Sequence, residues 1–300
     1  MNNEKLLTIF DISSHLNRAY RYRTGSNSKM DNEDFIDGIP VFAARSTLRS
    51  MYSEITAVTE LRSLSFSHLV CVLDHEGKNF RHRLSSLYKA GRPEKEEEFL
   101  RQRAILELAF KHLGYTLLKV PDVESDDVIG TIVTKCNAIG FPVTVHTRDK
   151  DMYALLTEST TIYSGVDRKM IVADDVYSKL GVTVDKVQDF LCLTGDAVDG
   201  VDGIPRIGAK TAAAILGVYT ADQIIEDPSL IENVKVRGAK GAAQSFSENI
   251  ETFKLARELV QLKTDVMLES NMREWQRKDA PMSVQNALFN AVQDYKQIQK

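Results

Sequence analysis

The sequence predicts an α/β fold with a mostly parallel sheet, because short apolar runs of strand length alternate with longer segments of helical spacing. A second observation also favours this fold class: an aspartate follows two of the apolar runs. In open α/β sheets, functional residues lie at the carboxyl ends of the strands. The expected strands are Leu6–Phe10, Leu69–Leu73, Tyr115–Val120 and Pro142–His146. The expected helices between them are Ala43–Leu64, Leu100–Leu113 and Asp126–Ile139.

Composition is that of an ordinary globular protein, with 43% hydrophobic and 27% charged residues among 300. The formal net charge of −4 excludes a globally basic nucleic-acid coat and leaves room for a local basic patch. The three cysteines lie in apolar runs without CxxC spacing, which favours a reducing compartment over a disulfide scaffold or a zinc site. The sequence shows neither a signal peptide nor a membrane span, so we expect a cytoplasmic protein.

The pattern becomes helical from about residue 184, which predicts an α/β core over residues 1–183 and a helical region over 184–300. Within that region, Gly203–Ala212 is typical of a helix end, a tight turn and a new helix near Gly208. Backbone N–H groups at such a helix start, with Lys210 beside them, suit a phosphate, and an ordinary packing corner is the alternative. Ser283–Lys300 is expected to form one amphipathic helix, and no internal repeat is apparent.

Acidic side chains recur where the ends of parallel strands would bring them together. Glu124-Ser125-Asp126-Asp127 precedes an expected helix, so capping is its alternative role, but capping needs only one side chain. Asp196 and Asp199 are one helical turn apart and alone would suit a solvated face. Together these carboxylates predict two sites for Mg²⁺ or Mn²⁺, whose preferred ligands are hard oxygens. The nine acids are Asp11, Asp74, Glu124, Asp126, Asp127, Asp149, Asp151, Asp196 and Asp199.

A basic segment, Lys78–Lys95, follows the second of the strand-end aspartates. It holds six cations against one acid, with aromatic residues between them. Arg81, Lys89 and Arg92 could hold phosphates and Tyr88 could stack on a base, while a solvated charged loop is the alternative. Lys235, Arg237 and Lys240 form a second basic spot.

These constellations, in this order, resemble the 5′ nuclease family, which includes the 5′→3′ exonuclease domain of bacterial DNA polymerase I, phage 5′ exonucleases and flap endonucleases. The resemblance covers roughly Leu6 to Asp265. Phe10-Asp11 through Arg18-Ala19-Tyr20 resembles the opening V-D-G-x-x-x-x-Y-R-A signature, and Tyr88-Lys89-Ala90-Gly91-Arg92 resembles Y-K-x-x-R. Further matches are Glu124–Asp127 to E-A-D-D, Thr147–Asp151 to T-x-D-K-D, Gly195-Asp196 with Asp199 to G-D-x-x-D-N, and Gly203–Ala212 to G-x-x-G-I-G-x-K-T-A.

The resemblance implies a PIN-like, Rossmann-like nuclease core with a helical arch at about residues 75–103 and a helix-hairpin-helix DNA-binding motif at about 198–217. By motif matching, Asp11, Asp74, Glu124, Asp126 and Asp127 would serve a first metal and Asp149, Asp151, Asp196 and Asp199 a second. Lys89, Arg92 and Arg81 would act on the scissile phosphate. K⁺ would bind at the hairpin. The DNA-binding set is Arg18, Tyr88, Gly203, Arg206, Gly208, Lys210, Thr211, Lys235, Arg237 and Lys240.

The implied function is metal-dependent cleavage of DNA at a 5′ flap, nick or RNA primer, by a monomer, in a bacterial or phage-infected cytoplasm. Some positions depart from the family pattern: Asn17 stands in place of a tyrosine and Arg206 in place of a hairpin glycine. A non-catalytic DNA-junction-binding protein and a PIN-type ribonuclease are the alternatives. The balance of exonuclease and endonuclease activity stays open, as does recruitment by a polymerase or a single-strand-binding protein.

Overall fold

The computed structural model describes residues 5–24, 31–62 and 66–300. Its main sheet has six strands in the order β5-β4-β1-β6-β7-β8, all parallel except the last pair. The strands are β1 Leu7–Asp11, β4 His68–Val72, β5 Leu117–Leu118, β6 Val143–His146, β7 Thr160–Ser164 and β8 Lys169–Ile171. A separate hairpin pairs β2 Phe35–Ile36 with β3 Ile39–Pro40. The predicted mostly parallel α/β core is confirmed.

Helices cover both faces of this sheet. Their bounds are α1 Ile12–Thr24, α2 Phe42–Arg62, α3 Phe80–Leu84, α4 Glu97–Leu113, α5 Ser125–Asn137 and α6 Ala173–Leu180, with short 3₁₀ turns η1 Asn32–Asp34, η2 Asp151–Leu155 and η3 Val184–Lys186. Side chains alternate along each strand, so Leu7 and Ile9 pack in one core with α5, while Phe10 packs in a second core with α2 and α4. The central strands β1 and β4 are buried along their whole length.

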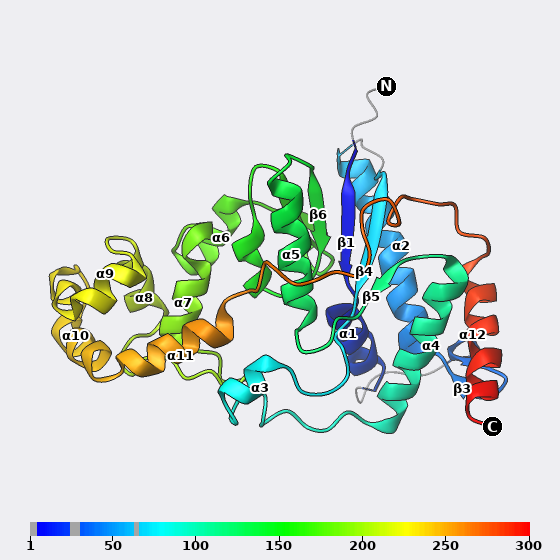
Figure 1. Ribbon diagram of the computed structural model, residues 1–300, viewed down its shortest axis with the longest axis horizontal. Helices are drawn as coiled ribbons and strands as arrows, with labels where there is room; N and C mark the ends of the chain where they lie inside the picture. The colour runs from blue at the N-terminus through cyan, green and yellow to red at the C-terminus, as the bar shows by residue number, and fades with distance from the viewer. Residues whose placement is uncertain (1–4, 25–30, 63–65) are drawn as a thin grey trace.

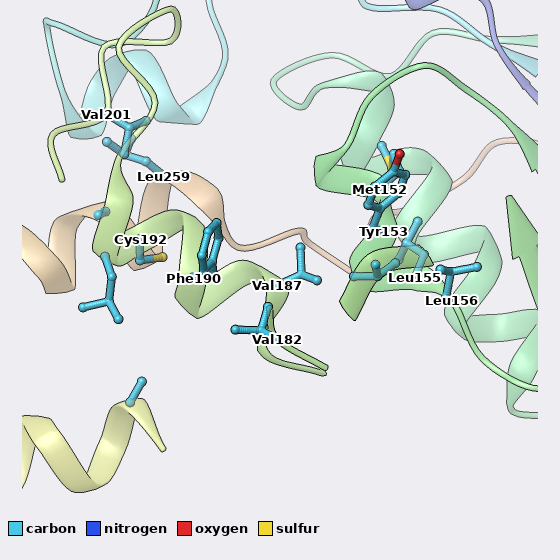
Figure 2. Close-up of a cluster of buried hydrophobic side chains, with 14 of the residues drawn as sticks. Met152, Tyr153, Leu155, Leu156, Val182, Val187, Phe190, Cys192, Val201 and Leu259 are labelled. Atoms are coloured by element: carbon cyan, nitrogen blue, oxygen red, sulfur yellow. The ribbon is translucent and has the colours of Figure 1, made fainter. Parts of the chain in front are cut away.

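The remaining helices follow the sheet in the chain. They are α7 Val187–Thr194, α8 Ala209–Leu216, α9 Ala221–Glu226, α10 Ala239–Glu248, α11 Ile250–Val260 and α12 Val284–Ile298, with the turn η4 Pro228–Asn233. The helices α8 to α10 gather at one end of the molecule, away from the sheet (Figure 1). Side chains of α7, among them Val187 and Phe190, join the apolar cluster that also holds Met152 and Leu155 from η2 (Figure 2). This shared core fixes the helical region against the sheet.

The C-terminal helix α12 lies against α4 and α2, on the α/β core, at the opposite end from α8 to α10 (Figure 1). Its Ala287, Leu288 and Ala291 are fully buried there. The sequence grouped this helix with the helical region, and the structure separates the two, because the apolar stripe of α12 completes the second core. None of the helices in the described ranges is long and apolar enough to cross a bilayer.

Candidate active site

A cavity of about 1100 Å³ opens beyond the carboxyl ends of β1, β4 and β6. This is the edge at which α/β sheets place their sites. Eight of the nine predicted acids line it, and they are Asp11, Asp74, Glu124, Asp126, Asp149, Asp151, Asp196 and Asp199. The structure therefore joins carboxylates that lie far apart in the sequence, as the positions of the strand ends predicted.

The first group of acids is held by hydrogen bonds at the strand ends. Asp11 ends β1, and the Thr147 hydroxyl donates to its Oδ2 at 2.7 Å. The Ser125 amide, at the start of α5, donates to Asp74 Oδ1 at 2.9 Å. The Asp74 amide donates to the Ser13 hydroxyl at 2.8 Å. The hydrogen bonds from Thr147 and Ser125 thus fix the orientation of the Asp11 and Asp74 carboxylates.

The second group lies on two turns. Asp149 accepts a hydrogen bond from the amide of Asp151 at 3.0 Å, in the segment that follows β6. Asp196 and Asp199 are not on a helix as their spacing suggested: they lie in a turn closed by paired backbone hydrogen bonds between Asp196 and Val201, each 2.9 Å. The turn still directs both carboxylates into the cavity.

Burial raises the pKa of several of these acids, and neighbouring carboxylates add to the shift. Burial, together with the charge of Asp74, raises the pKa of Asp11 to about 6. Burial and the charges of Asp149, Asp196 and Asp199 raise the pKa of Asp151 to about 7. Burial and four neighbouring carboxylates raise the pKa of Asp126 well above its usual range. Such a cluster needs cations to stay ionised at neutral pH.

We expect the metal-free protein to lose stability as the pH rises from about 4 to about 7. An acid whose pKa is raised in the folded chain holds its proton more tightly there than in the unfolded chain. The stability that this bound proton contributes is lost as the pH rises through about 6 for Asp11 and about 7 for Asp151. Thermal unfolding in EDTA across this range measures the effect, and added Mg²⁺ should remove most of it. A melting temperature that rises with pH in EDTA would contradict this account.

The donor set fits hydrated divalent cations. Every candidate ligand is a carboxylate, and Mg²⁺ binds such oxygens while it keeps several waters. Within the residues that the structure describes, no three acidic, histidine or cysteine side chains are grouped tightly enough to chelate one ion. The cavity therefore suits ions held by one or two carboxylates each, with water in the other positions.

Two cations from the basic segment already lie among the acids. Lys89 Nζ is 2.6 Å from Glu124 Oε1 and 3.7 Å from Asp199 Oδ2, and Arg92 pairs with Asp199. The Lys89 backbone has a φ of 54° and its amide donates to Asp199 O at 2.8 Å, which fastens the segment to the 196–201 turn. Gly200 makes this approach feasible, because a Cβ there would lie 2.2 Å from Leu87 O.

Tyr88, predicted to stack on a base, is only 4% exposed. Its hydroxyl donates to Glu124 Oε2 at 3.0 Å. The ring packs in the core at the wall of the cavity, and little of its surface is exposed for stacking on a base. The segment around it is short helix α3 followed by turns, so the predicted arch is mostly not helical before α4 begins at Glu97.

Asp127 lies apart from the other acids. It is fully buried, and Arg81 makes two hydrogen bonds to its carboxylate, at 2.6 and 2.7 Å. Arg81 also donates to the backbone carbonyls of Leu259 and Gln261, at 2.7 and 3.0 Å. This pair, expected from the resemblance to bind metal and phosphate, ties α3 and α5 to the end of α11 in the structure, and Arg81 also lines the cavity.

The predicted DNA-binding loops lie outside the cavity, in the helical region. α8 begins after Gly208, and Gly203 lets the preceding turn pass close to α7, since a Cβ there would lie 2.3 Å from Thr194 O. Arg206 adopts a φ of 66°, so it keeps the left-handed backbone that favours glycine. The Ser245 hydroxyl of α10 donates to Pro205 O at 2.6 Å, which packs this loop against α10.

The structure also reveals a repeat that the sequence reasoning missed. Gly208–Ala213 reads G-A-K-T-A-A and Gly238–Ala243 reads G-A-K-G-A-A. In each case the glycine caps the start of a helix, α8 or α10. A search for six-residue similarity would have found it. The repeat places Lys210 and Lys240 at equivalent positions on two neighbouring helices.

Arg18 of α1 also lines the cavity, where it is exposed. The sequence reasoning left out other polar residues that hold the acids, Ser13, Ser125 and Thr147. Their signal was available, since each stands beside a predicted acid at a strand or helix end.

The structure combines an α/β core, an acid-lined cavity at its strand ends and a helical region that follows the core. The family comparisons assign a chain with these features to a class of nucleases. Residues 6–181 match the N-terminal resolvase-like domain of 5′-3′ exonucleases, and residues 182–283 match their C-terminal SAM fold. The protein belongs to the 5′-3′ exonuclease family.

Curated relatives agree with this assignment. The 5′-3′ exonuclease of Aquifex aeolicus is 30% identical over 266 residues, which cover 88% of this chain and 84% of that one. DNA polymerase I of Pseudomonas aeruginosa is 36% identical over 88% of this chain. DNA polymerase I of Rhizobium leguminosarum is 32% identical over 79%. The chain spans only 28% and 23% of the length of these two polymerases.

Solved structures share the fold. The phage T5 protein co-crystallised with metal ions aligns over 99% of this chain and 100% of its own, with a TM-score of 0.66 at 18% identity. A phage T5 flap endonuclease in a complex with DNA and metal ions aligns over 87% of this chain and 90% of its own, with a TM-score of 0.64 at 22% identity.

Proposed function

We propose that the protein is a structure-selective 5′ nuclease, with 5′→3′ exonuclease and flap-endonuclease activity. It hydrolyses phosphodiesters where a 5′ single strand meets a duplex and leaves a 5′-phosphate and a 3′-hydroxyl. The observation that carries this proposal is one cavity in which eight carboxylates lie beside Lys89 and Arg92. Removal of flaps and RNA primers during DNA replication in the cytoplasm is the proposed role, and a polymerase or single-strand-binding protein at the same junction is the proposed partner.

The proposed cofactors are two Mg²⁺ ions, with Mn²⁺ as a substitute. Asp11, Asp74, Glu124 and Asp126 would surround the first, and Asp149, Asp151, Asp196 and Asp199 the second, with one or two carboxylates of each group as direct ligands and the others acting through water. When bound, the ions supply an activated water and neutralise charge on the phosphate. In this proposal Asp127 holds Arg81 in place and does not bind a metal ion directly. One chain contains every residue that the proposal uses, so we propose a monomer.

Lys89 and Arg92 have a second role in this proposal. Without substrate they pair with Glu124 and Asp199. With these carboxylates engaged by a divalent cation, the ammonium group of Lys89 and the guanidinium group of Arg92 would be free to donate hydrogen bonds to the scissile phosphate. Exposed Arg18, which also lines the cavity, would contact the same strand.

Duplex DNA would bind on the helical region. The loop from Gly203 to Thr211 exposes the first amides of α8, and Lys210 stands beside them. Arg206 lies within this loop, and the second basic spot lies just before and in the first turn of α10, where Lys240 stands. A phosphate backbone suits such amides and cations. K⁺ at the Gly203–Gly208 carbonyls belongs to the same proposal.

Lys89→Ala should lower the rate of cleavage by about 100-fold, the usual cost of losing one hydrogen-bond donor to a developing negative charge. Single-turnover cleavage of a 5′-flap duplex measures it. Lys78→Ala is the control, since Lys78 is exposed in the same segment. An unchanged rate for Lys89→Ala would make the segment a solvated loop without a part in the reaction.

The polarity of the proposed activity is tested with two substrates of the same sequence, one with a 5′ flap and one with a 3′ flap. The proposal predicts cut products near the junction of the 5′ flap and at least tenfold slower cleavage of the 3′ flap. Equal cleavage of both would contradict structure selectivity. Tight binding without cleavage in Mg²⁺ and in Mn²⁺ would favour a non-catalytic junction-binding protein.

A further inference from the structure

A single carboxylate is buried beneath the acid-lined cavity. Glu54 lies in the middle of α2 and is 5% exposed. It occupies the buried face of the helix with Met51 and Val58, where the helical spacing predicts an apolar residue. A buried charge is costly unless it is paired, so its partners show why the position tolerates an acid.

Four donors surround this carboxylate. His15 Nε2 lies 3.2 Å from both oxygens, His146 Nδ1 is 3.1 Å from Oε2, and the Ser50 hydroxyl donates to Oε1 at 3.0 Å. Arg148 Nη2 is 3.7 Å from Oε1. Burial acts to raise the pKa of Glu54, but hydrogen bonds from His146 and His15 outweigh it and lower the pKa to about 2.

Two of these donors lead directly to acids of the cavity. His15 Nδ1 hydrogen-bonds to Asp11 O at 2.7 Å. His146 is followed by Thr147, whose hydroxyl donates to Asp11 Oδ2 at 2.7 Å and accepts the Asp149 amide at 3.1 Å. Glu54 is therefore connected to Asp11 through α1 and to Asp149 through the end of β6. These two acids belong to different groups of proposed metal ligands.

The residues around the Glu54 carboxylate are closely packed. Gly165 follows β7, and a Cβ at this position would lie 2.0 Å from Glu54 Oε1. The Phe10 and His146 rings stack with centroids 4.1 Å apart, which fixes the orientation of His146. Glu54 thus has little room to move, and its donors have fixed directions.

We propose that Glu54 is a positioning residue that sets the spacing between the Asp11 and Asp149 ends of the metal site. The inference rests on the proposed nuclease function and deepens it. Its basis is one buried carboxylate that joins α1, the end of β6 and α2 through hydrogen bonds. Partners that orient ligands commonly contribute 10–100-fold to metal affinity or activity.

Glu54→Gln tests this with almost no change of shape. Glutamine offers one acceptor oxygen and an NH₂ donor, so one of the two imidazole N–H groups would face another donor. The Mg²⁺ concentration for half-maximal cleavage should rise by about tenfold or more. Mn²⁺ binding to the DNA-free protein, followed by calorimetry, should weaken by a similar factor, while the KM for flap DNA stays unchanged.

Matched variants separate positioning from general stability. Glu60→Gln, on the exposed face of the same helix, should leave both metal readouts unchanged. Glu54→Asp, which keeps the charge, should recover part of the loss. Should Glu54→Gln fail to fold, His146→Leu must show the same weakened metal binding, and His146→Asn, whose amide can donate near the Nδ1 position, must restore it.

The outcomes distinguish the inference from the proposed function. Unchanged Mn²⁺ and Mg²⁺ dependence in a folded Glu54→Gln variant of an active enzyme overturns the positioning role and leaves the nuclease function standing. A wild-type protein that binds Mn²⁺ but does not cleave overturns the function, and calorimetry of the variants still decides the role of Glu54. If Glu54→Gln lowers the fraction of active protein but leaves the Mg²⁺ and Mn²⁺ dependence unchanged, Glu54 has a merely structural role.

Discussion

Asp126→Ala should abolish flap cleavage, with a loss of at least about 1,000-fold, or about 4 kcal/mol of transition-state stabilisation. Burial and the charges of four other carboxylates, Asp149, Asp11, Glu124 and Asp74, raise the pKa of Asp126. Asp126 therefore lies where the two groups of proposed ligands meet. Without it the site loses the oxygen donor that lies between the two groups.

The same variant should bind flap DNA as tightly as the wild type in EDTA, because the proposed duplex contacts lie in the helical region. It should also be at least as stable without metal, since a buried carboxyl group crowded by other acids has been removed. Single-turnover cleavage, fluorescence anisotropy and thermal unfolding measure the three quantities. A parallel loss of binding and cleavage would count against a role in the chemistry.

Arg81→Ala should destabilise the fold by about 3–5 kcal/mol, because it leaves the buried carboxylate of Asp127 without its partner. The Arg81 side chain is 2% exposed and the Asp127 side chain 0%. The guanidinium also satisfies the Leu259 and Gln261 carbonyls, so its removal leaves several buried polar groups unpaired. Urea denaturation followed by circular dichroism measures the change.

Arg83→Ala is the control on the same short helix. Arg83 pairs with Asp122 at 2.5 Å, but the two side chains are 64% and 49% exposed, so the loss of stability should be far smaller than for Arg81→Ala. A fully stable Arg81→Ala variant with slow cleavage would instead return Arg81 to the catalytic role that the family resemblance implied.

The sequence predicted the central strands well because each is a short apolar run buried on both faces. It missed β7 and β8. β7 contains Thr160, whose hydroxyl donates to Asn137 at the end of α5, and Thr161, whose hydroxyl bonds to that of Thr144 in β6, and β8 is a short edge strand. Helix α1 was missed as well, since polar residues such as Ser13 and His15 interrupt its apolar pattern while serving the site.

The acids at the strand ends could be located from the sequence because the carboxyl ends of parallel strands lie at one edge of the sheet. The order of the family motifs then assigned these acids to two groups of metal ligands. The pairing of Arg81 could not be predicted, because its carbonyl partner Leu259 is 178 residues away. Nothing local distinguishes Asp127, which points inward, from Asp126, which points into the cavity. Glu54 did carry a signal, as an acid on the apolar stripe of its helix.

Reversible metal dependence of cleavage tests the central claim most directly. A 5′-flap duplex labelled at either end is incubated with the protein in Mg²⁺, then with excess EDTA, then with Mg²⁺ restored. The account predicts cleavage at the base of the flap, its arrest by EDTA and its return with Mg²⁺. Cleavage that continues in EDTA would contradict the assignment of the eight cavity carboxylates to divalent metal ions.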